Sequence, residues 1–595
     1  MNLPRRQDGQ MQVGIAHPGM AALLSFFARS RALQINRLVQ NAIRGIPSLK
    51  HGAAEEFPFV IAESVSPLKT NTDSRERQLQ LGKIENLRLA CQKIHLRVLV
   101  PGQVFSFWRQ VGAPTRLRGF KKGREVREGC VIPTTGGGLC QLSGSLLQVA
   151  LSADCELIER HHHSALPADV PYDPRRDATI FWNYVDLRFR SADPILFECY
   201  LTADTLVVRM RAKSPRPVAA HVEAALARSV LLRIGASCYT CFKTGCIRQC
   251  DPPEEEEVSK TAFLVAEPEA EFDEYVGRSF RRGDQFLAPG STLARHGPEL
   301  SHGELLSKRF PLFRFRKAWH LRSTVWRGGT VAKAHFHLAE VLARTYCKQV
   351  NYDVEHVCVA QTLLPHLWKA GLLGGRSFDV LMYRLPVKEL EEQLERASAI
   401  CSHSRTLGEF RAPRWFAEAE VQALKAARRI VTPHPQIAAL FGNAVRLAWK
   451  LPSGQTEVRG DRGEKDLVVF FGPTIARKGA YAVRDIVRQL GFELTVVGSE
   501  LEGPDFWRGI RVKRVDWEHL PWHRIHTVLQ PALFEFWPRH LLRAQAAGSR
   551  LLISPCCGIE EDRENGVYHV PFGETAPAVA ILESLLATRG ETLCV

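Results

Sequence analysis

The residue with the clearest chemical potential in this sequence is Cys140. It lies two residues after three consecutive glycines, residues 136–138, and begins an apolar run that predicts a helix. Glycines allow close backbone approach and positive φ. The free N–H groups and the positive dipole end at a helix start stabilise a thiolate. The pattern therefore predicts a thiolate at Cys140.

Two histidines and a carboxylate further along the chain suit this sulfur. His161 and His163 precede Asp177, and a strand is predicted just after this carboxylate, over 179–182. A cysteine, a histidine from the next element and an orienting carboxylate are the parts of a thiol acyl-transfer site. We therefore take Cys140, His161, His163 and Asp177 as candidate catalytic residues. Two alternatives stay open: His161 and His163 on one side of a strand could hold a metal, or all these groups only pack and cap.

A second cluster of chemical groups is a set of four closely spaced cysteines. They are Cys238, Cys241, Cys246 and Cys250. Four soft ligands in one short loop are what a tetrahedral zinc site requires, although thiolates also hold iron–sulfur clusters. We expect a structural zinc site, with an iron–sulfur cluster or four unligated cysteines as the alternatives.

The third pattern is a basic pair between a strand and a helix. A predicted strand over 467–471 leads to Gly472, and Arg477 and Lys478 then precede a predicted helix over 480–490. Basic side chains beside a helix N-terminus form an anion site, which suits a nucleotide diphosphate. This pattern alone is weak, because any Rossmann-like unit can show it.

The elements that must position the first site are mixed. Residues 1–60 predict a helical lead-in. Apolar residues at helical spacing predict a helix over 75–95. Strands are expected at the following ranges: 98–100, 104–108, 179–182, 196–200 and 206–210. This part of the chain is therefore α+β.

After residue 315, strand-like apolar runs alternate with helix-length amphipathic segments. That alternation is typical of a parallel sheet covered on both faces. The runs predict eight strands: 357–361, 378–383, 399–402, 429–432, 467–471, 494–497, 527–529 and 551–554. We expect two Rossmann-like lobes.

At 595 residues the chain is too long for one core, since cores stop growing at roughly 250–300 residues. We predict a multidomain protein with five segments. They are a helical lead-in (1–59), an α+β domain (60–215), a cysteine-rich hinge with the acidic linker 251–257 (216–260), an N-terminal Rossmann-like lobe (261–450) and a C-terminal lobe (451–595).

The composition is that of an ordinary globular protein with a basic charge. The net charge is +16, which favours anionic partners such as nucleotide-sugars, acidic glycans or anionic membranes. Scattered Arg and Lys residues argue against nucleic acid. The cysteine pattern indicates a reducing compartment. We expect a cytoplasmic location, with peripheral contact to the inner membrane left open.

The first third resembles the VanW family, which is named for a component of glycopeptide-resistance gene clusters. The resemblance spans about residues 60–210 and is carried by PGQVFSFW (101–108), GGGLCQLS (136–143), ERHHHS (159–164) and DAT (177–179). It implies a link to cell-wall or envelope chemistry such as peptidoglycan metabolism, without a settled reaction. Ser143-Gly144 replaces the family's more usual Ser-Asn or Ser-Thr, which leaves Cys140 in place.

Residues 320–580 resemble two-lobed (GT-B-like) retaining glycosyltransferases. The series LVVFFGP (467–473), LTVVG (494–498) and VLQPALFE (528–535) carries this resemblance. It implies that Arg477 and Lys478 contact a diphosphate, and that Glu535 is the first of two glutamates separated by seven residues. The second position holds Arg543, which puts donor choice or activity in doubt, because that carboxylate normally holds the donor ribose.

These patterns predict a protein of envelope metabolism whose C-terminal half transfers a sugar from a nucleotide-sugar to an envelope glycan or lipid-linked acceptor. Gly472, Arg477, Lys478 and Glu535 are the expected donor-binding residues. Two other classes stay open: a non-catalytic scaffold that binds glycan or peptide, and a thiol acyltransferase or peptidase centred on Cys140.

Overall fold

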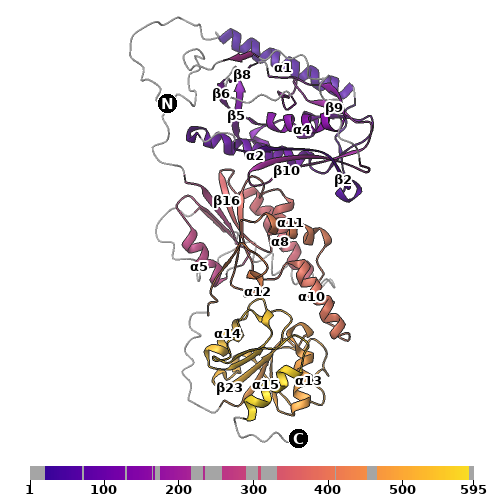
Figure 1. Ribbon diagram of the computed structural model, residues 1–595. Helices are drawn as coiled ribbons and strands as arrows, with labels where there is room; N and C mark the ends of the chain where they lie inside the picture. Colours follow the sequence, from indigo (N-terminus) through magenta and orange to yellow (C-terminus); the bar gives the residue numbers. More distant parts are fainter. Residues whose placement is uncertain are drawn as a thin grey trace, which may run out of the picture. The chain divides into compact units, whose positions relative to one another are not determined.

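The chain divides into two compact units, Met1–Glu257 and Val258–Val595 (Figure 1). In the computed structural model the described residues are 20–43, 45–69, 73–127, 130–163, 165–167, 175–215, 232–234, 258–267, 269–289, 306–309, 331–408, 411–451 and 465–587. No helix within these ranges is long and apolar enough to cross a bilayer. Each unit is described by itself.

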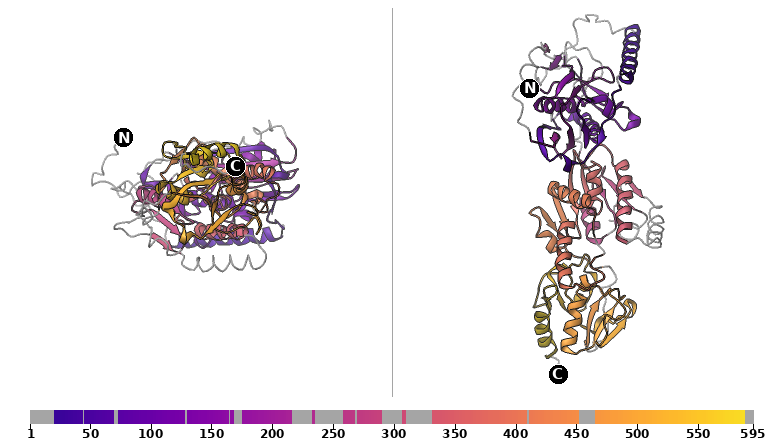
Figure 2. Two further views of the ribbon diagram at one scale, coloured as in Figure 1. Left: turned by 90° about the horizontal axis from the view of Figure 1, so that it is seen from below. Right: turned by 90° about the vertical axis from the view of Figure 1, so that its right-hand side faces the viewer.

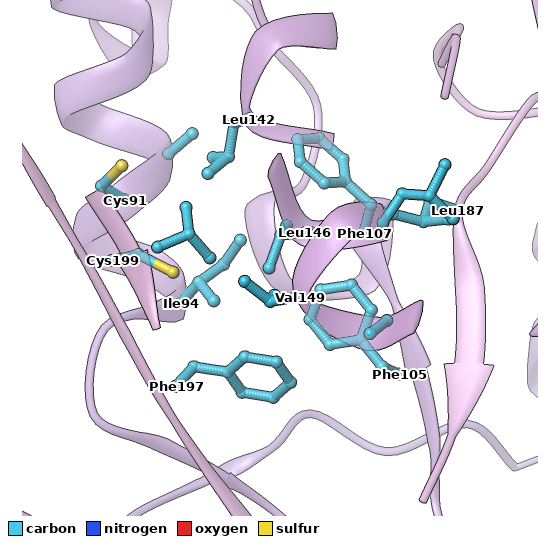
Figure 3. Packing of buried hydrophobic residues seen from close by; sticks show 14 of the residues in the cluster. Cys91, Ile94, Phe105, Phe107, Leu142, Leu146, Val149, Leu187, Phe197 and Cys199 are labelled. Carbon is cyan, nitrogen blue, oxygen red and sulfur yellow. The ribbon is translucent and has the colours of Figure 1, made fainter. Parts of the chain in front are cut away.

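Unit 1 is built on a five-stranded antiparallel sheet of order β1-β3-β10-β11-β2. Its strands are β1 Lys50–His51, β2 Phe59–Pro67, β3 Arg97–Leu99, β10 Ile195–Leu201 and β11 Thr205–Ala212. The helices α2 (Arg77–Ile94) and α4 (Cys140–Ser152) pack against the sheet. Figure 3 shows their apolar side chains meeting Phe197 and Cys199 of β10.

Smaller elements complete unit 1. One sheet has the order β4-β9-β7, with β4 Val104–Ser106, β7 Glu156–Glu159 and β9 Arg188–Arg190. A hairpin joins β5 (Lys122–Arg127) to β6 (Cys130–Thr135). The short strands β8 (Ala165–Pro167) and β12 (Leu232–Ile234) pair in parallel. The remaining helices are α1 (Met20–Ile43) and α3 (Phe107–Val111).

Unit 2 begins with a seven-stranded parallel sheet of order β15-β14-β13-β16-β17-β18-β19. Its strands are β13 Lys260–Leu264, β14 Gln285–Ala288, β15 Leu306–Arg309, β16 Val354–Ala360, β17 Ser377–Leu381, β18 Arg429–Thr432 and β19 Ala444–Arg446. The helix α5 (Ala270–Ser279) covers one face. The other face packs against α8 (Val331–Gln349), α9 (Leu364–Lys369), α10 (Val387–Ile400) and α11 (Arg414–Ala426).

A six-stranded parallel sheet of order β22-β21-β20-β23-β24-β25 follows. Its strands are β20 Leu467–Phe471, β21 Leu494–Val497, β22 Val512–Val515, β23 Ile525–Gln530, β24 Arg550–Ile553 and β25 Val567–His569. The helices α13 (Ala480–Leu490) and α15 (Ala576–Ala587) cover one face, and α14 (Arg539–Ala546) covers the other (Figures 1 and 2). The short α12 (Pro435–Ala438) lies between β18 and β19 in sequence.

The predicted fold class is confirmed, since an α+β unit precedes two parallel sheets whose orders are those of Rossmann-like lobes. Two predicted strands, 399–402 and 179–182, are wrong, and the strand predicted over 104–108 is confirmed only as far as β4 (Val104–Ser106). Residues 399–402 contain the end of α10, because a short apolar run cannot by itself distinguish a buried helix from a strand. Residues 107–108 begin α3, capped by the Ser106 side chain, and residues 179–182 form only an isolated bridge from Phe181 to Val185.

Candidate functional site

The glycine turn before Cys140 rests on a polar face of α2. Gln80, Lys83 and Asn86 are all buried there. The Asn86 side chain donates hydrogen bonds to the carbonyls of Lys121 (3.0 Å) and Gly137 (2.9 Å). Gly138 has a φ of +94°, and a Cβ on it would lie 2.0 Å from the Cγ of Lys83. The turn therefore needs glycine at this position, and it brings Cys140 to the start of α4.

The structure brings His163 and Asp177 to this cysteine. His163 Nδ1 lies 2.6 Å from Asp177 Oδ1, and the same carboxylate accepts a hydrogen bond from the backbone N–H of His163. Burial lowers the pKa of His163, but hydrogen bonds to Asp177 and to the Cys140 thiol outweigh it and raise the pKa to about 10. Cys140, His163 and Asp177 thus form one interacting group with the composition of a thiol triad.

The residues after Cys140 hold the segment that carries Asp177. The Ser143 hydroxyl donates a 2.6 Å hydrogen bond to the Ala178 carbonyl. A Cβ on Gly144 would lie 2.1 Å from the Arg176 carbonyl oxygen. The Ser143-Gly144 pair therefore permits a close approach of α4 to the residues on both sides of Asp177.

His161 is not part of this group. Its Nε2 lies 3.2 Å from Glu159 Oε1, and its side chain is 45% exposed. The strand β7 ends at Glu159, so His161 and His163 lie in a loop and not on one side of a strand, as the metal alternative required. Among the described residues, no three or more His, Cys, Asp or Glu side chains are placed so that they could hold a metal ion together. Cys238, Cys241, Cys246 and Cys250 lie outside the described residues.

In unit 2 the predicted donor residues lie at the switch point of the second sheet, between β20 and β23. Gly472 follows β20, and a Cβ on it would lie 2.4 Å from the Val497 carbonyl oxygen. Lys478 forms an ion pair with Glu535, which follows β23. Arg477 is exposed. Lys478 and Glu535 are therefore brought together, while Gly472 has a packing role.

Arg543 lies in an aromatic cluster near this pair. Its guanidinium stands 4.2 Å from the centre of the Trp522 ring. His540 stacks on Trp517 with ring centres 4.0 Å apart. Loss of solvation, with the nearby charges of Lys478 and Arg543, lowers the pKa of His540 to about 4. Cations and aromatic rings thus occupy the region where the resemblance to glycosyltransferases places a carboxylate.

A cavity of about 700 Å³ lies at the carboxyl end of the first sheet of unit 2. Residues 265–267, which follow β13, and Ala360, at the end of β16, line it. This is the switch point of that sheet, where open α/β sheets bind ligands. Pro473, Ile475 and Arg477 of the second lobe line the same cavity. Of the predicted donor residues, Arg477 alone is among the described lining residues.

Sequence reasoning missed two groups. The polar face of α2 supports the glycine turn, and the polar residues at positions 80, 83 and 86, which share one helix face, were the signal for it. Glu269 lines the cavity at the start of α5. Burial raises its pKa to about 7, although Arg539 acts in the opposite direction. No local pattern marks Glu269, because its burial depends on both lobes.

Comparison with known proteins assigns the first site to a family. Residues 82–211 match the model of the family described as "VanW like protein". The vancomycin B-type resistance protein VanW of Enterococcus faecalis is 29% identical over 151 residues, which cover 25% of this chain and 55% of that protein. The uncharacterized protein YoaR of Bacillus subtilis is 31% identical over 128 residues, or 21% of this chain and 41% of that protein. The chain thus spans about half the length of these relatives.

Solved glycosyltransferase structures match 56% of this chain. The galactosyltransferase WaaB is 13% identical, with 91% of its chain covered and a TM-score of 0.32. HepE of Anabaena, solved with UDP and glucose, is 14% identical, with 92% covered and a TM-score of 0.32. The sucrose-phosphate synthase of Thermosynechococcus elongatus is 13% identical, with 90% covered and a TM-score of 0.34. The strand orders of the two sheets define the two Rossmann-like lobes.

Proposed function

We propose that this chain, whose residues 82–211 form a VanW domain, acts in envelope glycan metabolism. Its unit 2 transfers a sugar from a nucleotide-sugar to an envelope acceptor. One observation carries this proposal. The cavity at the switch point of the first sheet is also lined by Pro473, Ile475 and Arg477, which follow the first strand of the second sheet. Donor and acceptor bound at the two switch points would meet there.

Two described residues, Arg477 and Glu269, have side chains that suit such a reaction. An acceptor oxygen bonds to the anomeric carbon of the sugar, the bond from that carbon to the diphosphate breaks, and the nucleoside diphosphate leaves with the electron pair. Arg477 supplies a positive charge for the leaving phosphates. Where the acceptor is a hydroxyl, its proton passes to a carboxylate, and Glu269, whose pKa burial raises to about 7, is suited to accept it.

The proposal is tested by calorimetry on the full chain with UDP and with GDP. We expect one of the two to bind with micromolar affinity, and Arg477→Ala and Lys478→Ala each to weaken that binding about tenfold or more, since each removes a charge from a phosphate. Arg488→Ala, at the far end of α13 and paired with Asp485, is the matched control and should bind as the wild type does. Absence of binding for both nucleotides would contradict the proposal and favour a scaffold.

A second function is supported by the 2.6 Å contact between His163 and Asp177 beside Cys140. We propose that the VanW domain transfers or hydrolyses acyl groups through Cys140. The sulfur attacks the acyl carbonyl to form a thioester, and His163 gives its proton to the leaving group. An amine or water then attacks the thioester carbonyl, the carbon–sulfur bond breaks with its electron pair on sulfur, and the attacking group's proton passes to His163. Peptide-resolved labelling of Cys140, described in the Discussion, is the test.

A further inference from the structure

The cavity of unit 2 has an apolar side formed by the helices of the first lobe. The apolar residues that line it include Phe336, Leu338 and Leu342 of α8, Leu363 before α9, Leu394 of α10 and Phe416 of α11. Five of these six are buried within the protein. A sugar or a peptide backbone would find few hydrogen-bond partners on this side.

The size of the cavity makes this lining significant. The cavity, with a volume of about 700 Å³, has room for many more than one water molecule, since about 10–15 Å³ is enough for one. Water in a cavity needs polar partners, and apolar side chains provide none. Replacing such water with an apolar chain is favourable. The apolar side is therefore suited to a hydrocarbon chain.

Two arginines, Arg405 and Arg477, also line the cavity. The carboxylate of Glu502 accepts hydrogen bonds from the backbone N–H of Arg405 (3.0 Å) and of Ala476 (2.8 Å), which brings Arg405 and Arg477 to the same buried anchor. Both arginines are exposed. Within the part of the chain that the structure describes, neither guanidinium has a hydrogen-bond or ion-pair partner. This region can bind an anionic group.

We propose that this cavity binds a single-chain lipid with a phosphate head group, with the chain on the apolar side and the phosphate on Arg405. That this lipid is the acceptor rests on the proposed sugar transfer. That the lipid binds here rests on the cavity alone. A chain with one anionic end fits this lining, because helices of the first lobe supply the apolar residues and the segment after α10 supplies Arg405.

The test titrates the full chain with hexyl, octyl and decyl phosphate below their micelle concentrations, and with inorganic phosphate. Each added methylene should raise the affinity roughly threefold to fourfold, which corresponds to about 0.8 kcal/mol per buried CH₂. Inorganic phosphate should bind weakly. Equal affinity along the series would overturn the proposal, as would binding of inorganic phosphate as tight as that of decyl phosphate.

Variants locate the binding. Ala339→Leu adds volume from α8 into the cavity and should weaken decyl phosphate about tenfold. Ala399→Leu makes the same change on an exposed part of α10 and should have no effect. Arg405→Ala, a change at an exposed residue, should weaken decyl phosphate but not decanol, and it keeps the test valid if Ala339→Leu fails to fold. Unchanged decyl phosphate binding in Arg405→Ala and in a folded Ala339→Leu would overturn the proposal.

A parallel titration with UDP and GDP separates the two proposals. Chain-length-dependent binding of alkyl phosphates without nucleotide binding would support the lipid site and contradict sugar transfer. Nucleotide binding without chain-length-dependent binding of alkyl phosphates would support the donor site and overturn the lipid site.

Discussion

His163 Nδ1 lies 2.6 Å from Asp177 Oδ1, although 14 residues separate them in the sequence. The same carboxylate accepts the backbone N–H of His163, so the ring and its own backbone are held by one partner. This arrangement leaves the other ring nitrogen for the Cys140 thiol, whose interaction contributes to the raised pKa of His163. A fixed ring orientation is what a triad histidine requires.

Asp177→Asn should change the reactivity of Cys140. Without the carboxylate, the pKa of His163 should fall from about 10 toward its ordinary value of 6.5, and the ring would lose its charge near neutral pH. We expect iodoacetamide labelling of Cys140 at pH 8 to slow about tenfold or more. Mass spectrometry of the labelled peptides gives the rate at each cysteine.

Two comparisons make this labelling experiment specific. Asp204→Asn, at an exposed residue of unit 1, should label as the wild type does. Cys91, whose pKa burial raises to about 12, should stay unlabelled in the folded protein. Equal labelling rates for Asp177→Asn and wild type would show that Asp177 does not act on Cys140 through His163.

Gly144→Ala should destabilise unit 1. The added Cβ would lie 2.1 Å from the Arg176 carbonyl oxygen, so α4 or the segment around Asp177 must move. Overpacking of this kind costs about 1–3 kcal/mol, measured by urea unfolding. Gly442→Ala is the matched control, because no atom lies within 4 Å of its added Cβ. A loss for Gly144→Ala no larger than that of the control would contradict the close contact.

Arg539→Ala should strongly destabilise unit 2. Arg539 Nη2 donates to Glu271 Oε2 at 2.6 Å, and the Glu271 side chain is fully buried. Removing one partner of a buried pair leaves an uncompensated charge and costs about 3–5 kcal/mol. Arg514→Ala removes a pair with Glu500 whose arginine is 61% exposed, and should cost less than about 1 kcal/mol. Similar losses in the two variants, measured by thermal unfolding, would contradict this ranking.

The stability of unit 2 should fall as the pH rises from about 4 to 7. Burial raises the pKa of both Glu269 and Asp273 to about 7, whereas unfolded carboxyl groups titrate near pH 4. The folded state thus holds these protons more tightly. Their contribution is complete below the unfolded pKa and is lost as the pH rises through the folded pKa. We expect a loss on the order of 2 kcal/mol from this pair.

Urea unfolding at pH 5 and pH 7, followed by tryptophan fluorescence, measures this dependence. Replacing both residues, by Glu269→Gln and Asp273→Asn, should flatten it. Glu518→Gln, at an exposed residue, should leave it unchanged. A double variant with the full wild-type dependence would assign the effect to other groups.

The outcome at His161 and His163 illustrates what local sequence could not decide. Both histidines follow β7 and precede Asp177, and a strand through them would place both on one side. The strand β7 ends at Glu159, before both histidines. His163 then forms a hydrogen bond with Asp177, whereas His161 contacts Glu159. The choice depends on where Asp177 is held, and Ser143 and Gly144 of α4 determine that position.

Sequence alone determined the local elements: the helix that begins at Cys140, the glycines before it, and the strand and turn that lead to Arg477. These depend on apolar periodicity and backbone freedom, which act over a few residues. Only the tertiary structure decided that Lys478 pairs with Glu535, that Arg477 lines a cavity with Arg405, and that Glu269 is half-buried beside Arg539. Such pairings join residues that lie far apart in sequence, and the packing of whole sheets and helices sets the distances between them.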